Sequence, residues 1–217
     1  MKNDSIKVNI LSTKIIANVT DDMLKQFDVP KGYRSLGLIT CDCDDVLYTA
    51  LDEATKDAQV EVVYGKSMYA GAGNASTKLA GEVLGIIAGP SPAEVKSGLT
   101  SIINFIETGV SFKSANDDDS IVYYAQCVSR TGSYLSKQAS IREGESLAYL
   151  VAPPLESIYA LDAALKSADV KLCVLFEPPT ETNFGGALLT GSQSACKATC
   201  DAFASAVKQI AENPFYE

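Results

Sequence analysis

Four acidic side chains stand at places where a fold could use them for chemistry. Asp44 and Asp45 follow the apolar run SLGLIT, Glu156 holds the corresponding place after SLAYLVAPP, and Glu82 lies in the short segment AGEV. Paired carboxylates are the minimum for general acid–base catalysis, and carboxylates also bind organic cations. An enzyme and a binding protein are therefore both open. For Asp44 and Asp45 a structural role is the alternative, because a helix is expected to begin nearby and helix N-termini favour negative charge.

Two other kinds of site are disfavoured by what the sequence lacks. The chain has no histidine, which removes the commonest general base and a frequent metal ligand. The pairs Cys41-x-Cys43 and Cys196-x3-Cys200 would form a zinc site only if the fold joined them, and neither has the C-x2-C spacing of zinc ribbons. We therefore expect reduced thiols and no metal. No P-loop motif occurs and the glycine-containing segment 71–76 is only loosely like a dinucleotide fingerprint, so no cofactor is expected.

Charge and hydropathy exclude two classes of binding partner. The 217 residues include 27 Asp and Glu against 18 Lys and Arg, a formal charge of −9. An acidic chain is a poor partner for nucleic acid, because phosphate binding needs a basic surface. No apolar run is long enough to span a membrane, and the N-terminal residues lack the apolar core of a signal peptide. We therefore expect a cytoplasmic protein with neither nucleic acid nor membrane as partner.

An internal repeat indicates two domains. The segment ALDEATKDAQV (50–60) matches ALDAALKSADV (160–170) at seven of eleven positions. The apolar runs SLGLIT and SLAYLV precede the two segments, and the runs VEVVY and VKLCVLF follow them. Such a pattern predicts a tandem duplication. We place the domains at 1–112 and 113–217, joined by the polar segment KSANDDDS (113–120), which we expect to be a solvated linker.

Each repeat is expected to alternate strands and helices. In the first repeat we predict strands at 15–19, 36–40, 60–64 and 81–88 and a helix at 49–58. A second helix is expected to begin after Ser91, because Ser91, Pro92 and Glu94 have the types of a capping box with proline at the first helical position. The fold class predicted is α/β, with a small sheet covered by helices in each repeat and no doubly wound nucleotide fold.

The sequence resembles the tandem-domain shell proteins of bacterial microcompartments, in particular those of ethanolamine utilisation. The resembling segments are spread over nearly the whole chain: RSLGLI (34–39), DEATK (52–56), VEVVYG (60–65), AGEV (80–83), VSRTGSYLS (128–136), AYLVAPPLE (148–156), DAALKSADV (162–170), PPTETN (178–183), LTGSQSACKA (189–198) and NP (213–214). The tandem duplication agrees with this resemblance.

The resemblance implies a structural protein with no catalytic residues. Each chain would contain two circularly permuted shell domains with a small antiparallel sheet. Three chains would form a homotrimer of pseudo-hexameric shape that tiles edge to edge with other shell proteins of a cytoplasmic microcompartment. It also implies a gated central pore for metabolites or cofactors.

The resemblance further implies a small-molecule site. Small pores between the two domains of each chain would bind ethanolamine, with acidic residues at the positions of Asp44, Asp45 and Glu82. We add Glu156 on repeat symmetry, and Phe112 as a wall or a carbonyl donor. An ammonium and hydroxyl ligand suits carboxylates and carbonyl oxygens.

Two segments at equivalent repeat positions are expected to line the central pore. They are 67–77, rich in glycine and alanine, and 177–186, in which Gly185 and Gly186 look like hinges. The alternative is two ordinary surface loops. The pore residues predicted are Ser67, Tyr69, Gly71, Gly73, Asn74, Thr182, Asn183 and Phe184.

Two other functions are alternatives to a structural role in a microcompartment shell. One is a trimeric small-molecule sensor that uses the acidic pocket for regulation. The other is an enzyme with carboxylate catalysis. Assembly separates the first from a shell protein, because a sensor stops at the trimer while a shell protein forms extended sheets.

Overall fold

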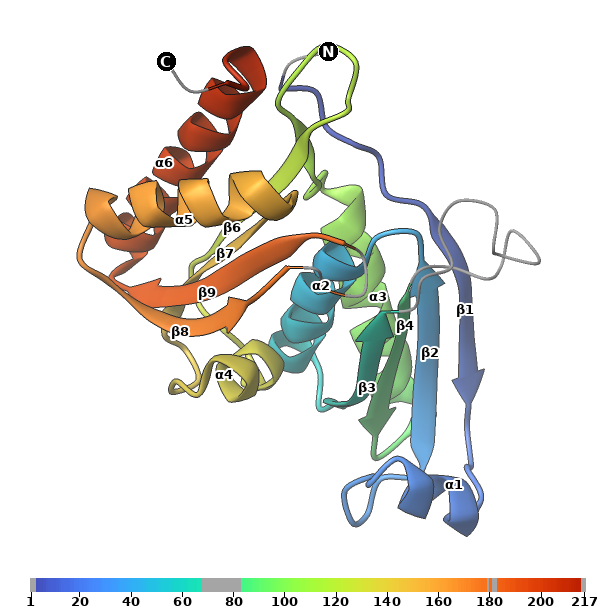
Figure 1. Cartoon of the computed structure of the whole chain (residues 1–217). Coiled ribbons are helices and arrows are strands. Elements are labelled where there is room, and N and C mark those ends of the chain that lie inside the picture. The colour runs from blue at the N-terminus through green and yellow to red at the C-terminus, as the bar shows by residue number, and fades with distance from the viewer. Residues whose placement is uncertain (1–2, 68–82, 179, 181–182, 216–217) are drawn as a thin grey trace. The chain divides into compact units, whose positions relative to one another are not determined.

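The computed structural model describes residues 3–67, 83–178, 180 and 183–215 (Figure 1). The chain divides into two compact units. The first unit comprises Val8–Val110 and Gly132–Leu135, and the second comprises Met1–Lys7, Ser111–Thr131 and Ser136–Glu217. The domain division 1–112 and 113–217 stays a prediction.

The sheet of the first unit has four antiparallel strands in the order β1-β2-β4-β3. These are β1 (Ile10–Ile16), β2 (Ser35–Cys41), β3 (Glu61–Ser67) and β4 (Val83–Gly89). The expected strand at 15–19 is wrong, because β1 ends at Ile16 and the backbone N–H of Val19 already bonds to the carbonyl of Arg34 at 2.9 Å. The other three strands lie where the apolar runs predict them.

Three helices pack with this sheet: α1 (Asp21–Gln26), α2 (Asp44–Asp57) and α3 (Pro92–Glu107). The predicted cap of α3 is confirmed, since Ser91 Oγ accepts the backbone N–H of Glu94 at 3.3 Å. Gly37 of β2 lets α3 approach closely: a Cβ there would lie 2.7 Å from Val95 Cγ1. Helix α2 begins at Asp44, well before the expected Thr49.

The second unit repeats this topology. Its antiparallel sheet has the order β5-β6-β7-β9-β8, with β5 (Lys113–Ser114), β6 (Val122–Val128), β7 (Ser146–Ala152), β8 (Val170–Phe176) and β9 (Gly185–Gly191). The helices that follow the same order are α4 (Ser133–Ala139), α5 (Pro154–Ser167) and α6 (Gln193–Glu212). The expected α/β class with antiparallel sheets is confirmed.

The duplication extends to an irregularity in the sheet. The register of β3 against β4 shifts between Val62 and Tyr64, and that of β8 against β9 shifts between Leu172 and Val174. The two shifts lie at the same distance along the repeat. A bulge is a conserved device for bending a strand, so the two sheets share their curvature as well as their strand order.

The segment 113–120 is more ordered than a linker. Its first residues form β5, and Ala115 N–H bonds to the carbonyl of Ile121 at 2.8 Å. The side chain of Asn116 donates to Ser120 Oγ at 2.7 Å and accepts the N–H of Ile121. The acidic residues 117–119 are exposed, as expected, but the segment is a tight turn of the second unit.

Candidate functional site

The two adjacent carboxylates Asp44 and Asp45 lie in the first turn of α2. The backbone N–H of Asp45 donates to Asp44 Oδ1 at 2.9 Å, so one carboxylate satisfies a helix-end donor. Asp45 is 9% exposed and Asp44 is half-buried. The alternative role, stabilisation of the helix N-terminus by these charges, is therefore supported. That role is compatible with ligand binding by the same carboxylates.

A short hydrogen-bonded chain links Asp44 to the end of β3. The hydroxyl of Ser67 donates to Asp44 Oδ2, and the hydroxyl of Tyr48 donates to Ser67 Oγ at 3.3 Å. Ser67 is the last residue of β3, at the start of the segment expected to line the central pore. The structure thus joins one predicted ligand residue to one predicted pore residue.

The negative charges of Asp44 and Asp45 affect the pKa of two neighbouring side chains. Burial, and then the charge of Asp45, raise the pKa of the Cys43 thiol well above its usual value. Burial also raises the pKa of the Tyr48 phenol, and the charges of Asp44 and Asp45 add to the effect. Both groups stay neutral at pH 7, so the start of α2 is an electronegative place that would favour a cation.

In the second unit, Phe112 belongs to an aromatic cluster. It is 8% exposed, stacks on Tyr124 with ring centroids 5.3 Å apart, and meets the edge of Phe184 at 5.9 Å. Tyr149 extends the cluster through Tyr124 at 5.6 Å. A predicted wall residue and a predicted pore residue therefore touch, although they are far apart in sequence.

The other predicted residues of the second unit are placed as follows. Glu156 is half-exposed in the first turn of α5, as Asp44 and Asp45 are in α2. Asn183 is exposed with a left-handed φ of 64°, and its N–H donates to the carbonyl of Thr180 at 3.1 Å. The remaining predicted residues lie outside the described part of the chain: Glu82, Tyr69, Gly71, Gly73, Asn74 and Thr182.

The hinge role expected for Gly185 and Gly186 is wrong. Both are buried at the start of β9, and they pair with Ala152 and Val151 of β7. A Cβ on Gly186 would lie 2.1 Å from the carbonyl oxygen of Leu150. Close approach of two strands, not freedom of the backbone, requires glycine here.

Sequence reasoning missed a fully buried carboxylate, that of Asp52 in α2. It is fully buried, and its two oxygens accept the N–H of Gly132 at 2.7 Å and of Leu135 at 2.8 Å. Burial raises its pKa, while these two N–H groups and Lys56, whose Nζ lies 3.9 Å away, act in the opposite direction. The only available signal was that Asp52 recurs as Asp162 in the repeat.

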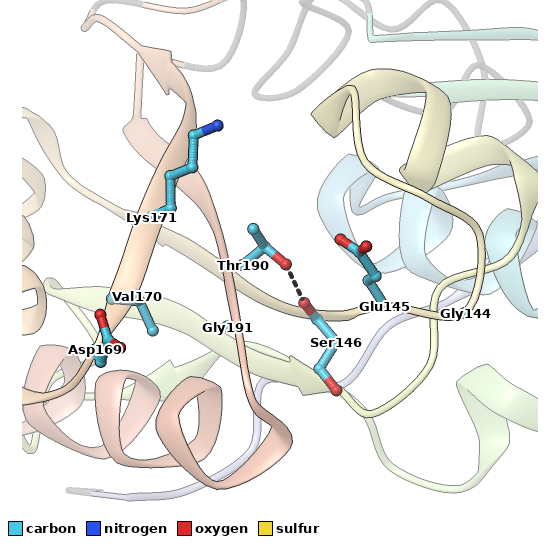
Figure 2. A pocket seen from close by; sticks show the side chains of 8 residues that line it. All are labelled: Gly144, Glu145, Ser146, Asp169, Val170, Lys171, Thr190 and Gly191. Atoms are coloured by element: carbon cyan, nitrogen blue, oxygen red, sulfur yellow. Dashed lines mark hydrogen bonds between the residues drawn. The ribbon is translucent and has the colours of Figure 1, made fainter.

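An open hollow of about 610 Å³ lies at the edge of the second sheet. Figure 2 shows Thr190 bonded to the carbonyl of Ser146, at 2.8 Å, in its floor. Glu145, at the rim of this hollow, accepts a hydrogen bond from Arg142 at 2.8 Å. None of the predicted site residues lines the hollow, which is bounded by Gly144, Glu145, Ser146, Asp169, Val170, Lys171, Thr190 and Gly191.

The cysteines carry the features of inert thiols. None of the six forms a disulfide bond: Cys41, Cys43, Cys127, Cys173, Cys196 and Cys200. Burial raises the pKa of Cys196 to about 11 and that of Cys200 further, so both stay protonated at neutral pH. Within residues 3–67, 83–178, 180 and 183–215, no three His, Cys, Asp or Glu side chains are grouped as a metal site would require. In the same residues no helix is long and apolar enough to cross a membrane.

Comparison with known proteins gives one consistent result. Residues 35–115 match the BMC domain family. The chain is 73% identical to the bacterial microcompartment shell protein EutL of Clostridium perfringens over 214 residues, which cover 99% of each chain. It is 54% identical to the shell protein EutL of Escherichia coli, over 97% of this chain and 96% of the other.

A solved structure extends the likeness to three dimensions. The crystal structure of the ethanolamine utilization protein EutL from Leptotrichia buccalis has a TM-score of 0.97 and 65% identity, with all of both chains covered. The sequence relatives are named as shell proteins and not as enzymes. The chain therefore belongs to the EutL family of bacterial microcompartment shell proteins.

Proposed function

We propose that this shell protein forms a homotrimer with a gated central pore, and that it binds ethanolamine through the carboxylates at the start of α2. The observation that carries the proposal is the contact between Asp44 and Ser67, because it joins a cation-binding group to the segment expected to line the pore. The name of the Leptotrichia relative, which mentions ethanolamine utilization, supports the choice of ligand.

The duplicated sheet supports the trimer. Each chain carries the strand order of one sheet twice, so three chains would supply six equivalent sheets. Closed rings with cyclic symmetry are the common solution for soluble homo-oligomers. A flat ring of six similar domains would also present similar edges to neighbouring shell proteins.

The extended shell can be tested by concentrating the purified protein and imaging it by negative-stain electron microscopy. We expect flat sheets with a regular repeat, because similar edges around a ring favour edge-to-edge tiling. Discrete trimers at every concentration would instead favour the sensor function. A dilute sample, which should contain separate particles, serves as the control.

The chemistry of Asp44 and Asp45 supports the ligand. An ionised carboxylate offers about four acceptor positions. In the described part of the chain, Asp44 accepts one hydrogen bond on each oxygen, from the Asp45 N–H and from the Ser67 hydroxyl. An ammonium donates up to three hydrogen bonds. The negative charges of Asp44 and Asp45, which add to the effect of burial in raising the pKa of Cys43 and Tyr48, would attract it. Glu82, Phe112 and Glu156 stay predicted members of the site.

Two contacts supply a route from ligand to pore. A cation bound at Asp44 would share that carboxylate with the Ser67 hydroxyl, and so would act on the end of β3. Phe112 contacts Phe184, which directly precedes β9. Ethanolamine shifts the pore equilibrium only as far as its affinity differs between the open and closed states.

The ligand assignment predicts the effect of neutralising both carboxylates. Calorimetric titration of ethanolamine should show binding at least tenfold weaker in the Asp44→Asn/Asp45→Asn double variant, because a charged hydrogen bond contributes about 1.5–3 kcal/mol. Binding to the wild type should also weaken at high salt, which screens the attraction between the ammonium and the two carboxylates.

The matched control is Asp117→Asn/Asp118→Asn, which removes two adjacent acids from an exposed turn. It changes the net charge equally and should leave the affinity unaltered. Equal weakening by both double variants would point to overall charge, and unchanged affinity in the first would refute the site. Circular dichroism of each variant verifies that the fold is intact.

A further inference from the structure

The hollow at the edge of the second sheet differs from the corresponding place in the first sheet. Its floor residue Thr190, on β9, pairs with Lys171 of β8, as Ala88 of β4 pairs with Glu61 of β3. Ala88 has no exposed surface, whereas Thr190 is half-buried. The same position of the repeat is therefore covered in the first unit and open in the second.

The cover in the first unit consists of apolar side chains. Phe27 and Tyr33, from the segment between α1 and β2, pack against the cluster that contains Ala88. The ring of Phe27 also meets the edge of Tyr64 at 5.8 Å. The equivalent segment between α4 and β7, residues 140–145 (SIREGE), has no aromatic residue. Small and charged residues thus leave the floor of the hollow open at Thr190.

The two sides of the hollow carry opposite charges. Lys171 lies on β8, Glu145 directly precedes β7, and β9 with Thr190 lies between these strands (Figure 2). Because neighbouring strands are about 4.8 Å apart, the two side chains are separated by about 10 Å across the floor. Burial raises the pKa of the Cys173 thiol, the charge of Lys171 lowers it, and the charge of Glu145 raises it. Both charges therefore lie near the same space.

These polar groups have bonding positions left for a ligand. The ammonium of Lys171 makes no hydrogen bond or ion pair with the residues that the structure describes. Glu145 Oε1 accepts a hydrogen bond from Arg142, whose side chain is 91% exposed, and within the described ranges Oε2 accepts none. The hydroxyl of Thr190 donates to the carbonyl of Ser146, so its oxygen can still accept.

We propose that this hollow binds a small zwitterion of the amino acid class, with its carboxylate at Lys171 and its ammonium at Glu145. A ligand with a single charge would meet one side of opposite charge and one side of like charge. Hydrogen bonds at both ends leave about 4 Å between the charged groups of the ligand, which is close to the spacing in β-alanine. Asp169, a second carboxylate of the hollow, lies on the side of Lys171, so a ligand that spans the floor reaches Glu145.

The site is separate from Asp44 and Asp45, and the inference does not rest on the proposed trimer or on ethanolamine binding. Exposed charge pairs contribute little, so we expect a dissociation constant in the millimolar range. Titration of β-alanine into the protein, followed by ligand-observed NMR, measures it. Propionate and propylamine keep the carbon chain but carry only one of the two charges, and each should bind at least fivefold more weakly.

Two variants test the charged sides of the hollow. Lys171→Met and Glu145→Gln should each weaken β-alanine binding at least fivefold, because each removes one of the two charges that the ligand meets. The matched controls are Lys96→Met and Glu61→Gln, which remove exposed charges from the first unit and should leave the affinity unchanged. Circular dichroism verifies that each variant is folded.

A charge exchange distinguishes ligand binding from a structural role. Lys171→Glu alone should abolish binding, whereas Lys171→Glu/Glu145→Lys lets the zwitterion bind in the reverse direction and should restore the affinity to within about threefold of the wild type. A folded double variant that does not bind β-alanine would overturn the proposal.

Three other outcomes would also overturn it. They are no binding of β-alanine to the wild type at tens of millimolar, equal binding of propionate or propylamine, and loss of binding in Asp44→Asn/Asp45→Asn but not in Lys171→Met. The last result would place the ammonium of β-alanine at the start of α2 and leave the ethanolamine proposal standing. Conversely, failure of ethanolamine to bind would leave the hollow unaffected.

Discussion

Replacing Asp52 with alanine is expected to lower the free energy of unfolding by about 3 kcal/mol, since an unsatisfied buried group costs about 1–3 kcal/mol. The change leaves the N–H groups of Gly132 and Leu135 without their acceptor in a buried place. It also leaves Lys56, which is mostly buried, without the carboxylate 3.9 Å from its ammonium. Chemical denaturation monitored by circular dichroism measures the loss.

The control for this change is Asp201→Ala. Asp201 also pairs with a lysine four residues away along its helix, Lys197 at 3.2 Å, but both side chains are about 70% exposed. Exposed pairs contribute about 0–1 kcal/mol, so this variant should be nearly as stable as the wild type. Equal losses in the two variants would contradict the special role of Asp52.

The pH dependence provides a second check on Asp52. Because burial raises its pKa above the 3.8 of the unfolded chain, the folded protein holds a proton that the unfolded chain has released. Stability therefore falls as pH rises through the window just above 3.8. The Asp52→Asn variant lacks this titration, so the stability of the wild type relative to it should decrease across that window.

Replacing Gly186 with alanine is expected to lower the free energy of unfolding by about 3 kcal/mol, at the upper end of ordinary overpacking costs. The new Cβ would lie 2.1 Å from the carbonyl oxygen of Leu150 and 3.1 Å from Val151 Cγ2. A backbone oxygen cannot turn aside as a side chain can, so β7 and β9 must separate. Thermal and urea denaturation measure the effect.

The comparison variant is Gly109→Ala. Gly109 has a φ of +92° and nothing within 4 Å of a Cβ, so alanine there meets backbone strain and no collision. We expect a cost of about 1 kcal/mol, typical of alanine at a left-handed glycine. A smaller loss at Gly186 than at Gly109 would show that β7 and β9 adjust to the extra methyl group.

Sequence patterns within a few residues correctly predicted the helices and strands that depend mainly on neighbouring residues. The capping box at Ser91 and Glu94 and the apolar runs of β2 and β7 needed only neighbouring residues. The duplication predicted that the second sheet would copy the first. The strand predicted at 15–19 is wrong because the chain leaves the sheet after Ile16 and turns toward α1.

The candidate site was predicted only in part, because its contacts join distant residues. Asp44 and Asp45 could be found from their charge and their place after a strand. The bond from Asp44 to Ser67 spans 23 residues, and that from Asp52 to Gly132 spans 80. Glycine composition suggested a hinge at Gly185 and Gly186, but pairing with β7 decides their conformation. Contacts between residues so far apart in the sequence cannot be predicted from patterns of neighbouring residues.

The exchange of short segments between the two units has a consequence for biosynthesis. The first unit is incomplete until Leu135 has left the ribosome, because the two oxygens of the buried Asp52 accept the N–H groups of Gly132 and Leu135. The second unit in turn uses residues made at the outset, since Asn3 and Ile6 donate to the carbonyls of Ser114 and Phe112. Folding in the order of synthesis therefore cannot finish one half before the other has begun. A nascent chain halted near residue 112 would leave Asp52 without the N–H groups of Gly132 and Leu135, and Asn3 without the carbonyl of Ser114. Such an incomplete fragment is a substrate for chaperones or proteases.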